Sequence, residues 1–356
     1  MRLGMIGFPQ SGKTTVFNAL TKGNLPPLVS GGRLEVHTAV VDVPDQRVER
    51  LADLFRPVKI TYARVTYADV AGLESGLGKK GFPGALLNQL SQMDGLLQVV
   101  RCFDDPAVAH SLGRVDPARD LASLDGELLL VDLLTVVRKL ERLEQDLRRN
   151  ANGERARLER EADLFQGLSA TLEAETPLRD LDFSVEDQKI LAGYGLLTLK
   201  PMLVVLNISE GQSPPAIAYP HRRNAVVALQ GKLEMELVQL PLEEVEDFKA
   251  AYGIQQLGLE RVIRHSYDLL GYQSFFTVGE DEVRAWQLRR GATALEAAGV
   301  IHTDLQRSFI RAEVIANEEL LSLGGINRAR ERGRLRLEGK DYLLQDGDIM
   351  HVRAGA

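Results

Sequence analysis

A motif of eight residues near the N-terminus constrains the fold more than any other feature of the sequence. Gly7–Thr14 reads GFPQSGKT and fits G-x-x-x-x-G-K-[ST]. In this pattern backbone N–H groups curl around phosphates, the lysine reaches the β- and γ-phosphate oxygens, and the hydroxyl binds Mg²⁺. Apolar residues before the motif predict a short buried strand, and those after it recur at helical spacing, which would place phosphate on a helix N-terminus. The residues expected to bind phosphate are Gly7, Gln10, Ser11, Gly12, Lys13, Thr14 and Thr15.

Bulk composition indicates a folded protein of two or three domains, with 44% hydrophobic and 26% charged residues in a chain of 356. No apolar run approaches the ~18 residues that a membrane helix needs, and MRLGMIGF runs directly into the phosphate loop without a cleavage site, so neither membrane insertion nor export is expected. A net charge of -7 argues against a protein that coats DNA or RNA indiscriminately. The single cysteine, Cys102, reads as a small apolar residue at a strand end, which fits a reducing cytoplasm.

Strand-like runs alternate with helical segments in a βαβ rhythm, which predicts an α/β fold with a parallel sheet. The runs cover residues 63–73, 95–103, 201–209 and 224–231. Between the second and third runs, apolar residues follow a spacing of three and four, interrupted by a turn-like ANGE at 151–154. This pattern predicts an antiparallel helical hairpin inserted in a nucleotide domain. The apolar positions are Leu133, Val136, Leu140, Leu143, Leu147, Leu158, Ala162, Phe165 and Leu172.

The last eighty residues predict a small β-grasp-like α+β module. Short runs such as VIHTD and FIRAEVI read as strands, and GKDY and QDGD read as turns. The stretch RARERGRLRL could be a nucleic-acid strip or a set of solvated strand residues. Residues 277–356 hold 12 Lys/Arg and 13 Asp/Glu, a balance of -1, so the second interpretation is at least as good. The predicted division is 1–128 and 199–276 for the nucleotide domain, 129–198 for the hairpin and 277–356 for the module.

A second motif, YADVAGL, ends an apolar strand with Asp69 and continues into a flexible loop. In P-loop switch proteins such an aspartate holds Mg²⁺ through water, and the following glycine, here Gly72, senses the γ-phosphate. The next position often carries a glutamine that orients the attacking water, but here it is Leu73. An aliphatic side chain cannot orient water, so hydrolysis needs another group or stays slow.

A third motif, VVLNISE, occupies the place of the base-reading N-K-x-D sequence, with Asn207 and Glu210 beyond a buried strand. Glutamate in place of aspartate lengthens the arm that would bind guanine. Guanine specificity is therefore doubtful. Ala228 and Leu229, at the next strand end, would place backbone amides beside the base.

With these motifs in this order, the chain resembles the YchF type of the Obg-related P-loop NTPases. The segments 69–94 and 269–351 strengthen the resemblance, which covers nearly the whole chain. It implies a P-loop NTPase domain, a coiled-coil arm and a C-terminal TGS domain, with ATP preferred to GTP, slow hydrolysis and binding to the ribosome or a ribosomal subunit. It also implies Mg²⁺ held by Thr14 and Asp69, and His110 as a catalytic aid beside Lys13, although a lone loop histidine is more often only solvated. Neither a membrane nor DNA is expected as a partner.

Two positions depart from the family pattern. Gln10 replaces an asparagine of the phosphate loop, and Arg33 falls on the threonine of the first switch, with Thr38 nearby but out of register. These departures leave two alternatives open, a GTPase of the same fold and an adaptor that holds ATP without appreciable turnover. A P-loop kinase would need an acceptor-binding lid, and the sequence shows none.

Overall fold

The computed structural model describes residues 1–23, 36–70, 82–149, 154–251 and 256–355. The predicted site residue Gly72, together with Leu73 and Arg33, lies outside these ranges, as does most of the turn predicted at 151–154. The chain divides into two compact units. The first contains residues 1–39 and 66–262, and the second contains residues 40–65 and 263–356.

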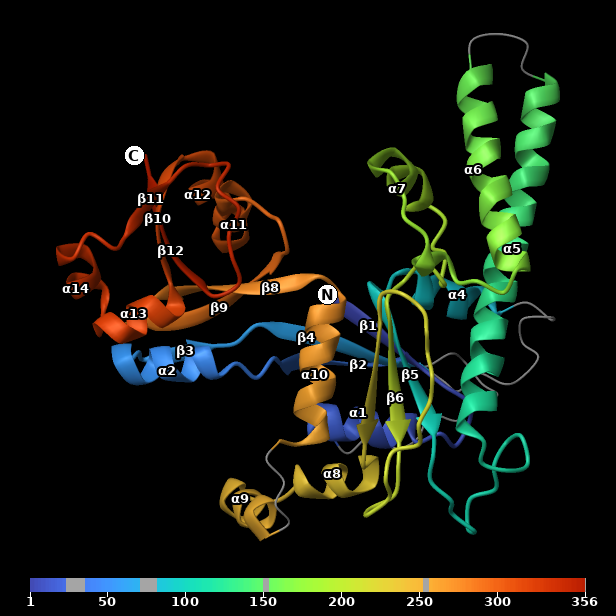
Figure 1. Cartoon of the computed structure of the whole chain (residues 1–356), viewed down its shortest axis with the longest axis horizontal. Helices are drawn as coiled ribbons and strands as arrows, with labels where there is room; N and C mark the ends of the chain where they lie inside the picture. Colours follow the sequence, from blue (N-terminus) through green and yellow to red (C-terminus); the bar gives the residue numbers. More distant parts are fainter. Residues whose placement is uncertain (24–35, 71–81, 150–153, 252–255, 356) are drawn as a thin grey trace. The chain divides into compact units, whose positions relative to one another are not determined.

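The first unit is built on a sheet in which the described strands follow the order β2-β4-β1-β5-β6-β7 (Figure 1). Strand β1 pairs in parallel with both β4 and β5, and β5, β6 and β7 are also parallel neighbours. The predicted parallel P-loop sheet is thus confirmed. The strand bounds are β1 Arg2–Ile6, β2 Val36–Asp42, β4 Arg64–Val70, β5 Gly95–Arg101, β6 Met202–Asn207 and β7 Asn224–Leu229.

The register of this sheet brings three of the sequence motifs to the same edge. Asp69 is level with Met5, two residues before the phosphate loop, and Asn207 is level with Arg101 and Leu229. Since the paired strands run in parallel, their carboxyl ends gather there. Helices α1, α4, α8, α9 and α10 follow the strands, with bounds Lys13–Thr21, Gly84–Ser91, Gly231–Leu237, Leu242–Ala251 and Gly258–Leu269.

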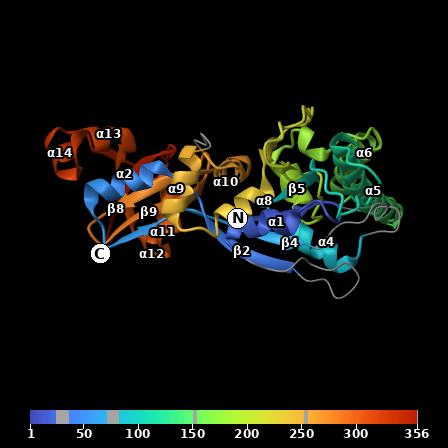
Figure 2. The same ribbon diagram turned by 90° about the horizontal axis from the view of Figure 1, so that it is seen from below.

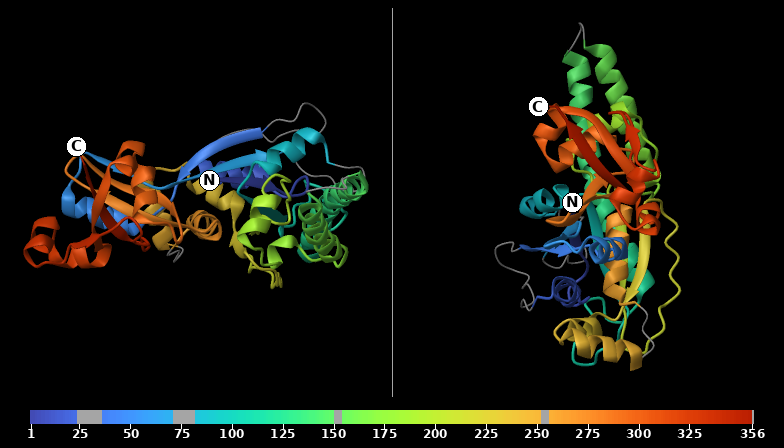
Figure 3. Two further views of the ribbon diagram at one scale, coloured as in Figure 1. Left: turned by 90° about the horizontal axis from the view of Figure 1, so that it is seen from above. Right: turned by 90° about the vertical axis from the view of Figure 1, so that its left-hand side faces the viewer.

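The predicted helical hairpin consists of α5 (Pro117–Arg149) and α6 (Arg155–Glu173), which run side by side (Figures 1 and 3). The helical phase read from the sequence is confirmed, because all nine of the predicted apolar positions lie in or against the hairpin core. The α5 helix begins well before the hairpin. Its first half packs Leu121, Leu124 and Leu128 in the core of the first unit's sheet, and its second half packs against α6. The short helices η1 (Leu178–Asp180) and α7 (Val185–Leu191) lead back to β6.

A buried carboxylate fixes the middle of α5 to the segment that precedes β6. Asp132 accepts hydrogen bonds from the Leu197 and Thr198 backbone N–H groups at 2.8 and 2.7 Å, and from the Thr198 hydroxyl at 2.6 Å. Burial raises the pKa of Asp132 to about 6, against the opposing effect of these hydrogen bonds. The base of the hairpin is therefore held by directional bonds as well as by apolar packing.

The second unit is a mixed sheet in which the described strands follow the order β11-β10-β12-β8-β9-β3. Its strands are β3 Lys59–Thr61, β8 Tyr272–Val278, β9 Glu282–Arg289, β10 Phe309–Ala316, β11 Arg336–Glu338 and β12 Asp348–Ala354. Its helices are α2 Gln46–Phe55, α11 Ala294–Ile301, α12 Thr303–Arg307, α13 Asn317–Leu323 and α14 Ile326–Glu331.

Residues 40–65 belong to this C-terminal unit although they lie early in the chain. Strand β3 pairs in parallel with β9, and α2 lies beside α13 (Figure 2). Arg47 of α2 binds Asp346 at 2.8 Å and lies 5.1 Å from the centre of the Phe276 ring. The second unit therefore contains a segment that the predicted module at 277–356 did not include.

Local predictions for the module are partly correct. GKDY and QDGD form turns, closed by hydrogen bonds from Tyr342 N to Gly339 O at 3.2 Å and from Asp348 N to Gln345 O at 3.1 Å. The strand predicted at VIHTD is wrong, because residues 300–304 join α11 to α12. A capping box between Thr293 and Glu296 starts α11 and favours helix over strand there. The first half of RARERGRLRL also lies largely in helix α14.

No helix among the described residues combines the length and the apolar character that crossing a membrane requires.

Candidate nucleotide-binding site

A cavity of about 830 Å³ opens at the carboxyl edge of the first sheet and brings the three sequence motifs together. The phosphate loop, the end of β4 and the loops after β5 and β6 contribute to its wall, and helix α8 completes it. Its lining residues are Pro9, Gln10, Gly12, Lys13, Thr14, Thr15, Asp69, Val70, Phe103, Asp104, Asp105, Val108, Asn207, Ile208, Ser209, Glu210, Lys232, Leu233, Met235 and Glu236. Gly7 and Ser11 are loop residues behind this wall.

The phosphate loop adopts a conformation that needs its second glycine. Gly12 has a φ of 88°, in the left-handed region, and a Cβ there would lie 2.2 Å from Asn207 Nδ2. Gly7 is similarly crowded, since a Cβ would lie 2.6 Å from the Val99 carbonyl oxygen. Helix α1 begins at Lys13, directly after Gly12. The loop thus leads into a helix N-terminus that faces the cavity, as an anion site requires.

Lys13 is buried in the loop, with its ammonium group bonded to backbone. Its Nζ donates to the carbonyl oxygens of Gly7 and Phe8, each at 3.2 Å. Burial lowers the pKa of Lys13 to about 8, and the negative charge of Asp69 partly offsets that effect. A phosphate in the cavity would supply the negative charge that this buried ammonium lacks.

Thr14 and Asp69 form the pair that the sequence predicted as the Mg²⁺ site. The Thr14 hydroxyl donates to Asp69 Oδ2 at 3.0 Å, so the two side chains meet although they come from different elements. Asp69 is 1% exposed, and its other oxygen, Oδ1, has no hydrogen-bond partner among the described residues. Burial raises the pKa of Asp69, while Thr14, Lys13 and His37 oppose that rise.

This pair fits Mg²⁺ better than it fits a metal bound only by protein. In the part of the chain that the structure describes, no group of three or more His, Cys, Asp or Glu side chains could hold a metal ion. Mg²⁺ keeps several waters and is commonly held by one or two side chains together with substrate phosphates. A hydroxyl, a carboxylate and an unpaired carboxylate oxygen beside a phosphate loop match that donor set.

Asn207 lies in the cavity wall but uses its amide within the protein. Its Nδ2 donates to the Ser11 carbonyl oxygen at 3.1 Å, and its Oδ1 accepts from the Gly231 N–H at 3.2 Å. The side chain therefore ties the phosphate loop to the start of α8. Glu210 is exposed on the same wall.

Ala228 and Leu229 do not line the cavity. The Ala228 carbonyl oxygen accepts from Arg261 at 3.1 Å, and that of Leu229 accepts from the Ile208 N–H at 2.9 Å. Lys232, Leu233, Met235 and Glu236 of α8 line the wall in their place. No sequence motif indicated this contribution, because GKLEME reads as an ordinary amphipathic helix.

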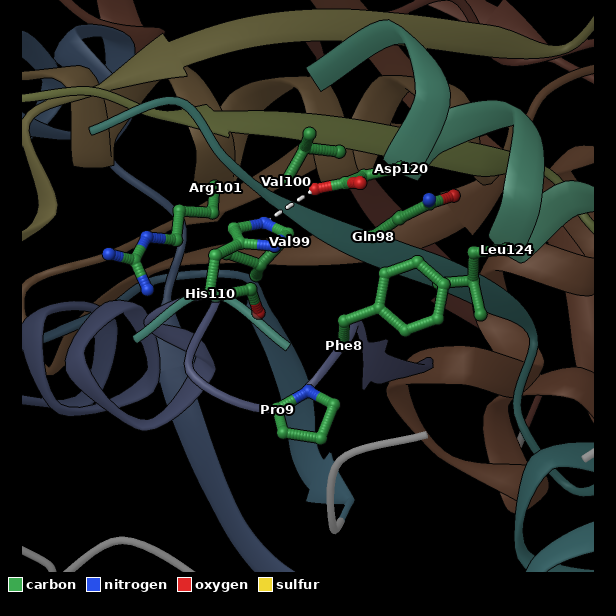
Figure 4. Close-up of a pocket in the computed structure, with 10 residues that line it drawn as sticks. Phe8, Pro9, Gln98, Val99, Val100, Arg101, His110, Asp120 and Leu124 are labelled. Carbon is green, nitrogen blue, oxygen red and sulfur yellow. Dashed lines mark ion pairs between the residues drawn. The ribbon is translucent and has the colours of Figure 1, made fainter. Parts of the chain in front are cut away.

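His110 lies in a separate, much smaller cavity behind the phosphate loop (Figure 4). Its Nε2 is 2.8 Å from Asp120 Oδ2, its Nδ1 accepts from the Leu112 N–H at 3.0 Å, and its side chain is 5% exposed. Since Nδ1 accepts, Nε2 carries the proton and donates to Asp120. Phe8, Pro9 and Ser11 share this cavity. His110 is thus neither solvated nor part of the large cavity wall, and Asp120, its partner on α5, is a residue that the sequence did not indicate.

Cys102 is buried beside the end of β5, as expected for a small apolar residue, and burial raises the pKa of its thiol.

Comparisons with known proteins place this geometry in a family. A family model described as YchF-GTPase_C, a protein of unknown function, matches residues 272–355. The ribosome-binding ATPase YchF of Bacillus subtilis (strain 168) is 37% identical over 365 residues, which cover 98% of this chain and 98% of that protein. The ribosome-binding ATPase YchF of Escherichia coli O157:H7 is 35% identical, with the same coverage of both chains.

A solved structure agrees with the sequence comparisons. The Schizosaccharomyces pombe YchF GTPase superposes with a TM-score of 0.86 at 30% identity, over 99% of this chain and 97% of that chain. The likeness extends over both units and is supported by sequence and fold together. The chain therefore belongs to the YchF family.

Proposed function

We propose that this protein is a ribosome-binding ATPase that binds ATP with Mg²⁺, hydrolyses it slowly and prefers it to GTP. The observation that carries the proposal is the single cavity that gathers the phosphate loop, the Thr14–Asp69 pair and the Asn207–Glu210 segment. Full-length similarity to proteins named ribosome-binding ATPases supports the same function. Association with ribosomes would place the protein in the cytoplasm.

Lys13 and the loop N–H groups are the groups proposed to stabilise charge on the transferring phosphoryl group, with water as the nucleophile. Lys13 would exchange its bonds to two carbonyl oxygens for bonds to phosphate. Thr14 and Asp69 would hold Mg²⁺, which neutralises charge on the phosphates when bound. Two further residues join these proposed site residues on the basis of the family resemblance: Gly72 as a sensor of the γ-phosphate and His110 as a catalytic aid.

The preference for ATP is proposed to come from Glu210 and nearby backbone rather than from Asn207, whose amide is bonded to Ser11 and Gly231. A glutamate drawn away from the base leaves the guanine N1–H and amine without an acceptor. Buried donors without partners cost about 1–3 kcal/mol, enough for about a tenfold preference.

Calorimetric comparison of ATP and GTP binding tests this function. ATP should bind about tenfold more tightly, and Glu210→Asp should narrow the difference. Lys13→Ala is the matched control: it removes the charge directed at phosphate and should abolish binding of both nucleotides. GTP bound at least about tenfold more tightly than ATP would instead support the GTPase alternative.

Sedimentation with ribosomes tests the proposed partner. The protein should pellet with ribosomes at low salt in at least one nucleotide state, since low salt strengthens charged contacts. Multiple-turnover hydrolysis measured in the same samples separates an ATPase from an adaptor. Absence of pelleting in every nucleotide state would contradict ribosome binding without affecting the nucleotide site.

A further inference from the structure

Three buried polar atoms without hydrogen-bond partners among the described residues belong to the region around the proposed Mg²⁺ site. They are Ser11 Oγ of the phosphate loop, Asp69 Oδ1 of β4 and Nδ1 of His37, on β2. A buried polar atom without a partner is destabilising, so such atoms are rare unless a ligand or water pairs with them. Neither the motifs nor the resemblance assigned a role to His37.

The register of β2 against β4 places His37 opposite Asp69. The two strands are neighbours in the sheet. Val43 N donates to Ala63 O at 2.7 Å, just beyond their ends, and Arg64 binds Asp42 at 2.9 Å. Both pairs fit an antiparallel ladder in which the two residue numbers sum to about 106, and the same ladder pairs 37 with 69.

The burial pattern of β2 agrees with this register. His37, Ala39 and Val41 are partly buried, whereas the alternate residues Thr38, Val40 and Asp42 are exposed, so His37 faces inward as Asp69 does.

Facing side chains with unpaired atoms and no direct bond indicate that a small polar group fits between them. Direct neighbours across an antiparallel pair have Cβ atoms about 4.5–5.5 Å apart, within reach of one shared water. Water bound to Mg²⁺ is a strong hydrogen-bond donor, and both a carboxylate oxygen and an imidazole nitrogen without a proton accept from it.

We propose that His37 is a positioning residue of the nucleotide site, whose Nδ1 and Asp69 Oδ1 together accept hydrogen bonds from the water shell of Mg²⁺. This inference rests on the proposed function, because it presumes ATP bound with Mg²⁺. His37 would supply a polar group from β2 in a chain that has Arg33 at the position of the threonine of the first switch. Thr38, the nearest threonine, is exposed on the opposite face of β2.

The test compares ATP affinity in Mg²⁺ with ATP affinity in EDTA for four proteins. His37→Phe keeps a ring without nitrogen, His37→Asn keeps a polar atom near the Nδ1 position, and Thr38→Ala is the matched control on the exposed face. His37→Phe should reduce the gain in affinity from Mg²⁺ by about tenfold or more, with affinity in EDTA unchanged. His37→Asn and Thr38→Ala should keep most of that gain.

Each outcome bears on a different statement. A Mg²⁺ gain that persists in His37→Phe would overturn the role of His37 and leave the proposed function intact. Weaker binding of His37→Phe in EDTA as well would show that His37 acts on the fold and would also overturn it. A wild-type protein that binds ATP without any Mg²⁺ effect would contradict the proposed function itself.

Discussion

Lys13 has a protonation state that nucleotide binding should change. Its pKa of about 8 results from burial in a loop that offers two carbonyl oxygens but no close carboxylate bond. Polyphosphate in the cavity would favour the charged form and raise this pKa above its present value. Because the folded pKa lies below the ordinary lysine value of 10.5, the free energy of unfolding of the free protein should rise with pH between these two values.

ATP binding should therefore take up protons at alkaline pH. At about pH 9 Lys13 is mostly neutral in the free protein, and binding should take up about one proton, whereas at about pH 7 it should take up close to none. Calorimetry in buffers of different ionisation enthalpy measures this uptake. Equal uptake at both pH values would contradict the assignment of Lys13 as the phosphate ligand.

His110 lies behind the phosphate loop, and the role proposed for it in turnover can be measured separately from nucleotide binding. The His110→Ala variant should lower kcat with little change in the Kd for ATP, because a group that acts only in the transition state contributes to kcat. Asp120→Asn is the informative companion, since it keeps the imidazole and weakens the contact that holds it. Single-turnover assays that give wild-type rates for His110→Ala would limit the imidazole to packing behind the loop.

Among the elements, α5 links the nucleotide unit to its arm in one continuous helix. The apolar phase of its second half was readable from the sequence, because both hairpin helices bury the same face along their length. The start of this helix at Pro117 could not be read from the sequence. Residues 117–128 pack against a sheet rather than a helix, and the core residues that they contact lie in distant parts of the chain. The phosphate loop and the Asp69 strand end were predictable from local spacing. The α8 wall and the His110–Asp120 pair were not, because both depend on contacts between distant segments.

Removal of the buried carboxylate in α5 should loosen the base of the arm. Asp132→Ala leaves the buried N–H groups of Leu197 and Thr198 without acceptors, which should cost on the order of 1–3 kcal/mol at neutral pH. Asp146→Ala, at an exposed position of the same helix, is the matched control and should change stability little. Urea unfolding monitored by circular dichroism measures the difference.

The same substitution has a pH signature. The folded pKa of Asp132, about 6, is above the ordinary aspartate value of 3.8. Its contribution to the free energy of unfolding is therefore fully present below pH 3.8 and is lost as pH rises through about 6. The deficit of Asp132→Ala should therefore be larger at about pH 4.5 than at about pH 7. A deficit that grows with pH would contradict the burial of this carboxyl group.

At the scale of the whole molecule, the second unit cannot be removed by cutting the chain at residue 277, because residues 40–65 are part of it. Residues 40–65 depend on that unit for their partners: β3 for β9, Arg47 for Asp346, and α2 for the sheet that covers Val48 and Leu51. Both of these apolar side chains are fully buried. Sequence reading could not detect this arrangement, because no local pattern records a pairing with a strand so far along the chain.

Deletion of residues 277–356 should expose the apolar face of α2 and lower the thermal stability of the remaining chain. Binding of a hydrophobic dye and the midpoint of thermal unfolding measure this effect. The full-length Arg50→Ala variant is the control, because it loses only a surface ion pair to Glu318 and should change stability by less than about 1 kcal/mol. A truncated chain that unfolds at the wild-type temperature without binding dye would contradict this dependence.

The pairing of β3 with β9 also sets an order for folding during synthesis. Thr61 and Glu282, which share a hydrogen bond, are 221 residues apart in the chain. At about 5–20 residues per second, the early strand would wait on the order of ten to forty seconds for its partner to be made. Through that time the α2 segment has no sheet to cover it, and a chain halted before residue 289 would keep an unpaired strand and an uncovered helix. The segment between β2 and β4 should therefore reach its folded state only near the end of translation, although its residues are among the first to be made.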